Sequence, residues 1–253
     1  MITNSFMFKG SENCIFPIEL VGERFILKVF RDNRMDFDSD VLKEKYMFYK
    51  DHDILDILDI GGINTDKRNL YIIYRYIMGD SKFLYSNQDL EILARKLFEF
   101  HNYDYKNDCF NYDNSYVKRI MDENNLLNKM PSFDSCFIHG DLHPGNIIWT
   151  SNETLAFIDL DNCAYGPREY DISNIRFDIA LYNGVRKAED FWEYYNRLYK
   201  TSTESIYNWD KILLNIQEKR VNQWINNSGI DCVVPLETIH SNYFAWEKYI
   251  ISI

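Results

Sequence analysis

The sequence has 253 residues, of which 46% are hydrophobic, so it is long enough for one large domain or two lobes with a sizeable core. Its formal net charge of −11 argues against nucleic acid and anionic membranes as partners and suits a cationic small molecule. Because the five cysteines form no Cys-x-x-Cys pair, and neither a signal-peptide pattern nor an apolar stretch of about 18 residues occurs, we expect a cytoplasmic protein with reduced thiols and no membrane span.

Short apolar runs near the start of the chain predict three strands in an antiparallel meander. Turns that contain Gly10 and Gly22 separate the runs, and turns of this kind favour hairpins. The strands are expected at Phe6–Lys9, Cys14–Leu20 and Arg24–Phe30.

One charged residue, Lys28, interrupts the third of these strands. By alternation it shares a face of the sheet with Ile26 and Phe30. A lysine on an apolar face is costly unless it is paired or reaches water. Lys28 therefore either has a functional partner or lies on an edge strand and extends its amine into solvent.

A helix should follow, capped at residue 38 or 39 and continuing to about Lys50. Val41, Glu44 and Phe48 have the spacing of residues on one helical face. Glu44 would then lie within an apolar stripe, where a partner for Lys28 is expected. The alternative for Glu44 is a surface salt bridge.

The apolar run Leu70–Gly79 ends at a glycine and predicts the last strand of the small sheet. From residue 87 the period becomes helical, with apolar residues on one face as far as His101. We interpret His101 as a core histidine with satisfied hydrogen bonds. A further helix is expected at Ser115–Leu127, and residues 175–253 are helical in pattern.

The segment Phe137-Ile-His-Gly-Asp-Leu-His-Pro-Gly-Asn146 begins as an apolar strand and continues with two glycines and a proline. Because Gly and Pro break helices and allow tight turns, we expect a loop that presents Asp141 and Asn146. A hairpin should follow and end in Ile158-Asp-Leu-Asp161. Acidic groups and an amide are thereby brought near one another.

Phosphoryl transfer uses this set of groups. One carboxylate accepts the proton of the attacking hydroxyl, and a second carboxylate and an amide oxygen hold Mg²⁺ on the nucleotide phosphates. The two segments resemble the signature of the aminoglycoside phosphotransferase and choline kinase superfamily, whose members are relatives of the protein kinases. That signature is His-Gly-Asp-x-His-x-x-Asn followed by Ile-Asp-x-Asp/Glu, and residues 139–146 and 158–161 fill every position.

The resemblance implies a role for each polar residue of the two segments. Asp141 would be the catalytic base, and Asn146 and Asp159 would be Mg²⁺ ligands. Asp171 matches the family's Tyr-Asp position and would brace the loop through backbone hydrogen bonds. Asp161 is either a contact to a substrate amine or the metal, or a turn carboxylate; on an extended chain it would point to the same side as Asp159.

The resemblance also implies a nucleotide site in the first part of the chain. Lys28, paired with Glu44, would hold the phosphates of ATP or GTP. The first turn carries Ser11 and Asn13 and takes the place of the glycine-rich loop of protein kinases. The purine base would lie against the backbone of Tyr74, Arg75 and Tyr76.

Two alternatives to this interpretation differ in kind from it. His139 and His143 have the spacing of a zinc-binding helix with Asp141 as a third ligand, but the glycines and the proline argue against a helix. A plain turn explains Gly and Pro but not two acids that end an apolar strand. The second alternative corresponds to an inactive relative, a non-catalytic kinase-like binding protein.

We therefore expect an α+β protein with a bilobal, protein-kinase-like fold. Residues 1–78 would form the N-terminal nucleotide-binding lobe, a small antiparallel sheet with one helix. Residues 79–253 would form the larger, mostly helical lobe for catalysis and substrate binding. The expected reaction is Mg²⁺-dependent transfer of the γ-phosphoryl group of ATP or GTP to a hydroxyl group by a monomeric enzyme.

The expected substrate is a small, hydroxylated, cationic molecule such as an aminoglycoside-like antibiotic, which would make the enzyme a resistance factor. Charge alone suggests six acidic residues as amine contacts: Asp178, Glu189, Asp190, Glu193, Glu218 and Glu247. The main alternative is a choline- or ethanolamine-type kinase. Such an enzyme would need an aromatic cage, for which Trp192, Tyr194, Tyr195, Trp224 and Trp246 are available.

Overall fold

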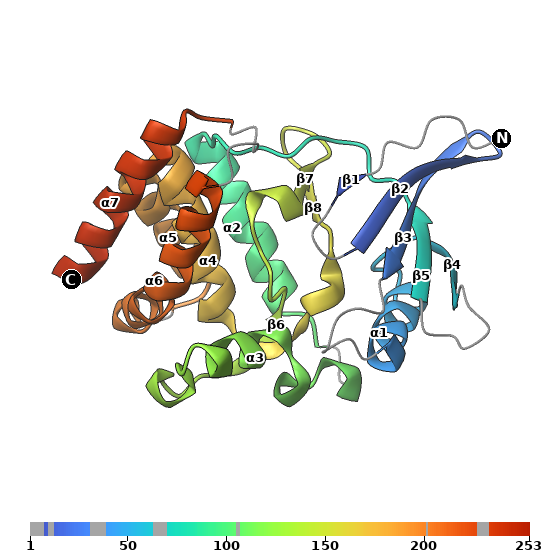
Figure 1. The fold of residues 1–253 in the computed structure, drawn as a ribbon, viewed down its shortest axis with the longest axis horizontal. Coiled ribbons are helices and arrows are strands. Elements are labelled where there is room, and N and C mark those ends of the chain that lie inside the picture. The colour runs from blue at the N-terminus through green and yellow to red at the C-terminus, as the bar shows by residue number, and fades with distance from the viewer. Residues whose placement is uncertain are drawn as a thin grey trace. The chain divides into compact units, whose positions relative to one another are not determined.

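The computed structural model describes residues 8–9, 13–30, 39–62, 70–104, 107–200, 202–226 and 233–253. Contacts divide the chain into two compact units, Met1–Met78 and Gly79–Ile253. The smaller unit is built on an antiparallel sheet and the larger is mostly helical (Figure 1), which confirms the predicted α+β class.

The smaller unit contains a five-stranded antiparallel sheet with the order β1-β2-β3-β5-β4. One helix, α1 (Ser39–Asp51), packs against β4. The predicted meander of the first three strands is present, whereas β4 was missed because Asp59 and two glycines interrupt its apolar pattern. The strands are β1 (Phe8–Lys9), β2 (Asn13–Leu20), β3 (Glu23–Phe30), β4 (Ile57–Gly62) and β5 (Leu70–Arg75).

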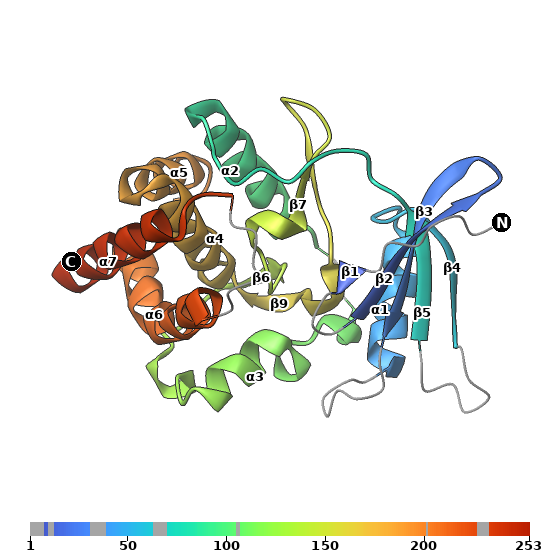
Figure 2. The ribbon, with the colours of Figure 1, turned by 45° about the horizontal axis from the view of Figure 1, so that its top comes forward.

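The larger unit is organised around α4 (Arg168–Asn183), which buries 13 of its 16 residues. Helices α5, α6 and α7 contact α4, and α2 contacts α5 (Figures 1 and 2). Within the described residues, no helix is both long and apolar enough to cross a membrane. The other helices are α2 (Asn87–His101), α3 (Tyr116–Glu123), α5 (Val185–Leu198), α6 (Thr203–Asn226) and α7 (Leu236–Ser252).

Two small antiparallel sheets complete the larger unit. The first pairs β6 (Ser135–Ile138) with β9 (Ala164–Pro167), and the second pairs β7 (Ile147–Trp149) with β8 (Leu155–Phe157). The second sheet is the hairpin that the sequence predicts after the Gly- and Pro-containing loop.

Side-chain caps fix where α2 and α3 begin. Ser86 Oγ accepts from the N–H of Asp89 at 3.1 Å, and Asp89 Oδ2 accepts from the N–H of Ser86 at 2.9 Å, which forms a capping box at α2. At α3 the cap is one-sided, since Ser115 Oγ accepts from the N–H of Lys118 at 3.1 Å. Helix α3 ends earlier than predicted because Asn125 takes up a left-handed conformation with φ 55°.

A fully buried arginine joins α4 to its neighbours. Arg176 donates to Asp210 of α6 and to Glu189 of α5, and its guanidinium carbon lies 5.5 Å from the ring centroids of Tyr207 and Trp246. Burial raises the pKa of Asp210 to about 6, and the charge of Arg176 opposes this increase. Because each buried charge has a partner, removal of one partner should cost much more than a surface pair contributes.

We expect Arg176→Met to lower the free energy of unfolding by about 3–5 kcal/mol, because Asp210 would be left buried without its cation. Adding Asp210→Asn should restore part of the loss. Arg186→Met provides the control, since Arg186 pairs with Asp190 but its side chain is 78% exposed, and it should cost less than about 1 kcal/mol. Urea unfolding measures all four proteins, and equal losses for Arg176→Met and Arg186→Met would contradict this account.

Candidate active site

The loop that contains Asp141 lies between β6 and β7 and turns sharply at Gly140. Gly140 has φ +78°, a conformation that favours glycine. A Cβ at this position would lie 2.4 Å from the carbonyl oxygen of Asn162. The loop and the turn at residues 160–162 therefore approach too closely for any other residue at position 140.

A buried carboxylate holds the first part of this loop. Asp171, in the first turn of α4, accepts from the N–H of His139 at 2.6 Å and from the N–H of Gly140 at 3.0 Å. Its side chain is 0% exposed. This arrangement confirms the prediction that Asp171 braces the loop through backbone hydrogen bonds.

Asp171 is in turn supported by residues from three helices. His101 at the end of α2 bonds Asp171 at 3.2 Å and Tyr195 of α5 at 2.7 Å, and Arg168 of α4 donates to the Tyr195 hydroxyl at 3.3 Å. Burial lowers the pKa of His101, while the hydrogen bond to Asp171 acts in the opposite direction. His101 is therefore a satisfied core histidine, as predicted. The contributions of Tyr195 and Arg168 were missed, because no local pattern links residues so far apart in the sequence.

The two histidines of the loop serve as hydrogen-bonding groups of the loop itself. His139 is 0% exposed, and its Nε2 bonds the carbonyl of Ile158 at 2.9 Å while its Nδ1 accepts from the N–H of Asp141 at 3.3 Å. His143 Nδ1 accepts from the N–H of Gly145. Because the segment is a loop and both rings are engaged within it, the zinc-helix alternative is wrong.

The loop presents one free carboxylate and one oriented amide. Asp141 is half-buried, and no donor in the described part of the chain bonds its carboxylate. Asn146 is 6% exposed, and its Nδ2 donates to the carbonyl of Asp141 at 2.9 Å. This hydrogen bond fixes the side-chain amide of Asn146 and leaves its Oδ1 as the group that can bind a ligand.

The β7–β8 hairpin brings Asn146 close to Asp159. Asn146 immediately precedes β7, and its carbonyl accepts from the N–H of Ile158 at 3.0 Å, directly before Asp159. An amide oxygen and a carboxylate are ligands that suit Mg²⁺, which completes its shell with water and phosphate oxygens. Across the described residues, His, Cys, Asp and Glu form no cluster of three or more that could hold a metal ion by itself.

The backbone between Asp159 and Asp161 is a turn and not an extended strand. Asp159 is left-handed, with φ 60° and ψ 54°, and a 3₁₀ turn follows at Leu160–Asn162. The chain is therefore not extended at this point, and the expectation that Asp159 and Asp161 point to the same side for that reason is wrong. A role of Asp161 in substrate binding rests on the sequence alone.

In the smaller unit, Lys28 lies on an internal strand. Strand β3 is flanked by β2 and β5, and Lys28 stands opposite Ile15 and Ile72. Its side chain shares a buried face with Ile26 and Phe30 and is 1% exposed. The edge-strand alternative is therefore wrong, and Lys28 is a buried cation.

The structure does not bring Glu44 to Lys28. Helix α1 buries Leu42, Lys45, Tyr46 and Tyr49, while Glu44 is exposed. The predicted apolar stripe is thus rotated away from its expected position. No ion pair joins Glu44 to Lys28 among the residues that the structure describes, so a role for Glu44 at the nucleotide remains a prediction.

The other residues predicted to bind the nucleotide differ in how far the structure describes them. Ser11 lies outside the described residues, and Asn13 begins β2 opposite Phe30. The N–H groups of Arg75 and Tyr76 already donate to carbonyls, of Asp56 at 2.8 Å and of Arg24 at 3.0 Å. These two N–H groups are therefore not available to a purine base, and its placement beside Tyr74–Tyr76 remains a prediction.

The aromatic residues proposed for a choline cage are mostly core residues. Trp192, Tyr195 and Trp246 are buried, and the rings of Trp192 and Trp246 already face the Arg176 guanidinium. Tyr194 lies beside Arg197 on α5. The cage built from these residues is therefore wrong; the side chain of Trp224 lies outside the described residues.

The acidic residues proposed as amine contacts fall into three groups. Glu189, Asp190 and Glu193 are paired with arginines. Glu218 and Glu247 lie near Tyr243 and help to raise its pKa to about 12, after burial, which is the main cause. Asp178 is closest to the loop.

Asp178 is coupled by charge to the loop that contains Asp141. It bonds Arg220 at 2.5 Å, and its Oδ2 is buried with no hydrogen-bond partner. Burial raises the pKa of Asp178, Arg220 and His143 oppose the increase, and Asp141 adds to it. The shared influence of Asp141 and His143 places Asp178 within electrostatic range of the loop.

A family of known proteins matches part of this sequence, and solved structures share its fold. Residues 86–205, which contain the loop, the hairpin and Asp171, match the phosphotransferase enzyme family. The resemblance to the aminoglycoside phosphotransferase and choline kinase superfamily is confirmed. No curated protein sequence matches the chain.

Solved structures of this superfamily extend over nearly all of the chain. The amicoumacin kinase hAmiN, in complex with AMP-PNP, Ca²⁺ and Ami, is 14% identical in sequence, and its structure matches with a TM-score of 0.64. The match covers 98% of this chain and 88% of the hAmiN chain. A thermostable mutant of aminoglycoside phosphotransferase APH(4)-Ia is 12% identical with a TM-score of 0.62, covering 99% and 95%. Choline kinase LicA from Streptococcus pneumoniae is 15% identical with a TM-score of 0.58, covering 100% and 94%. At such identities the likeness supports the kinase-like fold.

The burial of His101 leads to a prediction about pH. As the pH falls through about 6.5, the unfolded chain binds a proton at His101 that the folded chain does not, so stability should decrease between about pH 7 and pH 5. His101→Gln should remove this contribution, which amounts to at most about 1.4 kcal/mol per pH unit. His240→Gln is the control, because His240 is exposed on α7. Identical pH slopes for the wild type and His101→Gln would contradict the assignment of a neutral histidine.

Proposed function

We propose that this protein is a Mg²⁺-dependent kinase that transfers the γ-phosphoryl group of ATP or GTP to a hydroxyl group of a small cationic molecule, such as an aminoglycoside-like antibiotic. The observation that carries the proposal is the free carboxylate of Asp141 on a braced loop, next to the fixed amide of Asn146. A catalytic base must be able to reach the hydroxyl of its substrate, and Asp141 has no competing partner in the described chain.

The remaining groups have complementary roles in this mechanism. Asn146 Oδ1 and the Asp159 carboxylate would hold Mg²⁺, which supplies charge neutralisation on the phosphates. Lys28, which is buried on an internal strand, would add a positive charge for the nucleotide phosphates. Related structures were obtained with AMP-PNP or ADP, which favours a nucleotide as the donor.

Charge favours a cationic substrate. The chain carries a formal net charge of −11, and Asp178 adds a buried carboxylate oxygen within electrostatic range of Asp141. Similar folds include a kinase in complex with Ami and one in complex with hygromycin B. The choline-kinase alternative has structural neighbours too, but two of the aromatic residues proposed for its cage, Trp192 and Trp246, are core residues that face Arg176.

A coupled nucleotide-turnover assay tests the proposal. The full-length protein is supplied with ATP or GTP and with hydroxylated amines that include aminoglycosides, amicoumacin, choline and ethanolamine. Turnover with an antibiotic amine supports the proposal, and turnover with choline or ethanolamine alone supports the metabolite-kinase alternative. Nucleotide binding without turnover on any amine would favour a non-catalytic relative.

On a confirmed substrate, Asp141→Asn should lower turnover by about 10²–10⁴-fold, because the amide has almost the same shape but cannot accept the hydroxyl proton. Nucleotide affinity should change little. Asp122→Asn removes an exposed carboxylate on α3 and serves as the control. Steady-state kinetics and nucleotide calorimetry measure both effects, and full turnover in Asp141→Asn would remove Asp141 from the mechanism.

Asp159→Asn should raise the Mg²⁺ concentration needed for nucleotide binding by at least about tenfold, because one of the two proposed ligands loses its charge. Asparagine is the replacement of choice because it tolerates the left-handed backbone at this position. Asn152→Ala, in the exposed turn of the same hairpin, is the control. Mg²⁺ titrations followed by calorimetry should separate the two variants, and an unchanged Mg²⁺ requirement in Asp159→Asn would exclude it as a ligand.

A further inference from the structure

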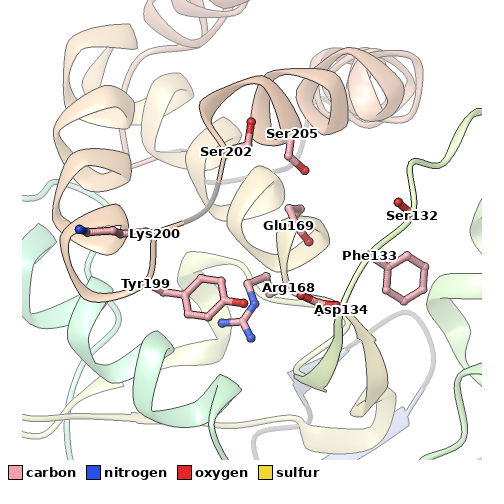
Figure 3. A pocket seen from close by; sticks show the side chains of 9 residues that line it. All are labelled: Ser132, Phe133, Asp134, Arg168, Glu169, Tyr199, Lys200, Ser202 and Ser205. Atoms are coloured by element: carbon pink, nitrogen blue, oxygen red, sulfur yellow. The ribbon is translucent and has the colours of Figure 1, made fainter.

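A pocket of about 350 Å³ lies in the larger unit (Figure 3). Its walls come from the start of α4, the α5–α6 connection and the segment before β6. Asp134 and His139 lie on either side of β6, five residues or about 16 Å apart along the strand. The pocket is lined by Ser132, Phe133, Asp134, Arg168, Glu169, Tyr199, Lys200, Ser202 and Ser205.

The central feature of the pocket is a buried carboxylate oxygen without a donor. Glu169 is 8% exposed, and its Oε2 has no hydrogen-bond partner. A carboxylate in the first turn of α4 is favoured by the helix dipole, which accounts for its charge. The dipole does not account for a buried oxygen that lacks a donor, because such an oxygen costs free energy unless a ligand bonds it.

Of the two cations of the pocket, one is held by tyrosines and the other is exposed. The guanidinium of Arg168 lies 3.6 Å from the ring centroid of Tyr199 and donates to the Tyr195 hydroxyl. Lys200 is exposed and extends away from Glu169 in Figure 3. Besides Arg168, whose charge acts on Glu169, the lining contributes the oxygens of Asp134, Ser132, Ser202 and Ser205.

We propose that this pocket binds a small organic cation through a primary ammonium group, with Glu169 Oε2 as the acceptor. An ammonium group brings both the N–H donor that Oε2 lacks and a charge that compensates Glu169 and Asp134. A quaternary ammonium has no N–H and cannot satisfy the oxygen. The serine hydroxyls can accept the remaining N–H groups.

Electrostatics at Glu169 add a pH dependence. Burial raises its pKa, Arg168 and a hydrogen bond from Ser205 lower it, and the charge of Asp134 raises it further. A bound ammonium favours the ionised carboxylate. Affinity for the cation should therefore decrease as the pH falls and Glu169 becomes protonated, and it should be nearly independent of pH when residue 169 cannot ionise.

The test uses probes that carry no hydroxyl group and cannot be phosphorylated. Butylammonium, tetramethylammonium and butanoate are titrated separately into the full-length, isotope-labelled protein, and amide shifts are followed by NMR. Saturable shifts at pocket residues with butylammonium, and much weaker ones with the other two, are expected. Equal responses to butylammonium and tetramethylammonium, or a stronger response to butanoate, would overturn the proposal.

Substitutions of the lining residues test whether butylammonium binds in this pocket. Glu169→Gln should lower the affinity of the protein for butylammonium by about tenfold, because a charge-assisted hydrogen bond is about twice as strong as a neutral one. It should also remove the pH dependence of this affinity. Asp134→Asn changes an exposed residue and should lower the affinity for butylammonium by a smaller factor. Glu153→Gln, in the exposed hairpin turn, and Asp141→Asn should bind as the wild type does.

These variants keep the pocket and the proposed kinase activity distinguishable. Unchanged affinity in both Glu169→Gln and Asp134→Asn, or shifts confined to the catalytic loop and lost in Asp141→Asn, would exclude this pocket as the site. If Glu169→Gln fails to fold, Asp134→Asn alone decides, and affinity equal to that of the wild type excludes the site.

Discussion

The carboxylate of Asp171 fixes the backbone at which the proposed chemistry occurs. Its two oxygens accept the N–H groups of His139 and Gly140 just before the loop turns. A buried N–H without an acceptor costs about 1–3 kcal/mol, so the loop is strongly held in this conformation. Because the backbone is secured from inside the protein, the side chain of Asp141 needs no partner of its own and is available to a substrate.

Helix α4 provides the frame for this arrangement and for the second pocket. Asp171 reaches the loop, Arg176 reaches α5 and α6, and Asp178 reaches Arg220 of α6, so these charges on the buried helix tie it to three segments. Such pairs contribute little net stability but are costly to break. The helix can therefore shift along its neighbours only if several of these pairs are broken together.

The sequence predicts the local features well because their physical causes are local. Gly and Pro determine the loop, and alternation determines the hairpin and the burial of Lys28. The errors involve contacts between distant segments. One residue along a helix rotates the side chain by about 100°, so a small misjudgement of the apolar face of α1 was enough to expose Glu44. Trp192 and Tyr195 of α5 and Trp246 of α7 pack in the core, and composition alone could not distinguish this from a binding cage.

The chain of hydrogen bonds behind Asp171 has a fixed direction. Arg168 can only donate and the Asp171 carboxylate accepts, so Tyr195 must direct its proton to Nδ1 of His101, and His101 must carry its own on Nε2. A second proton on the imidazole would face a hydroxyl oxygen that already accepts from Arg168. The direction of these hydrogen bonds thus selects the tautomer of His101 that carries its proton on Nε2 and disfavours the imidazolium form. Residues on three helices, beginning at the wall of the second pocket, therefore set the ionisation state of His101, the histidine behind the loop that contains Asp141.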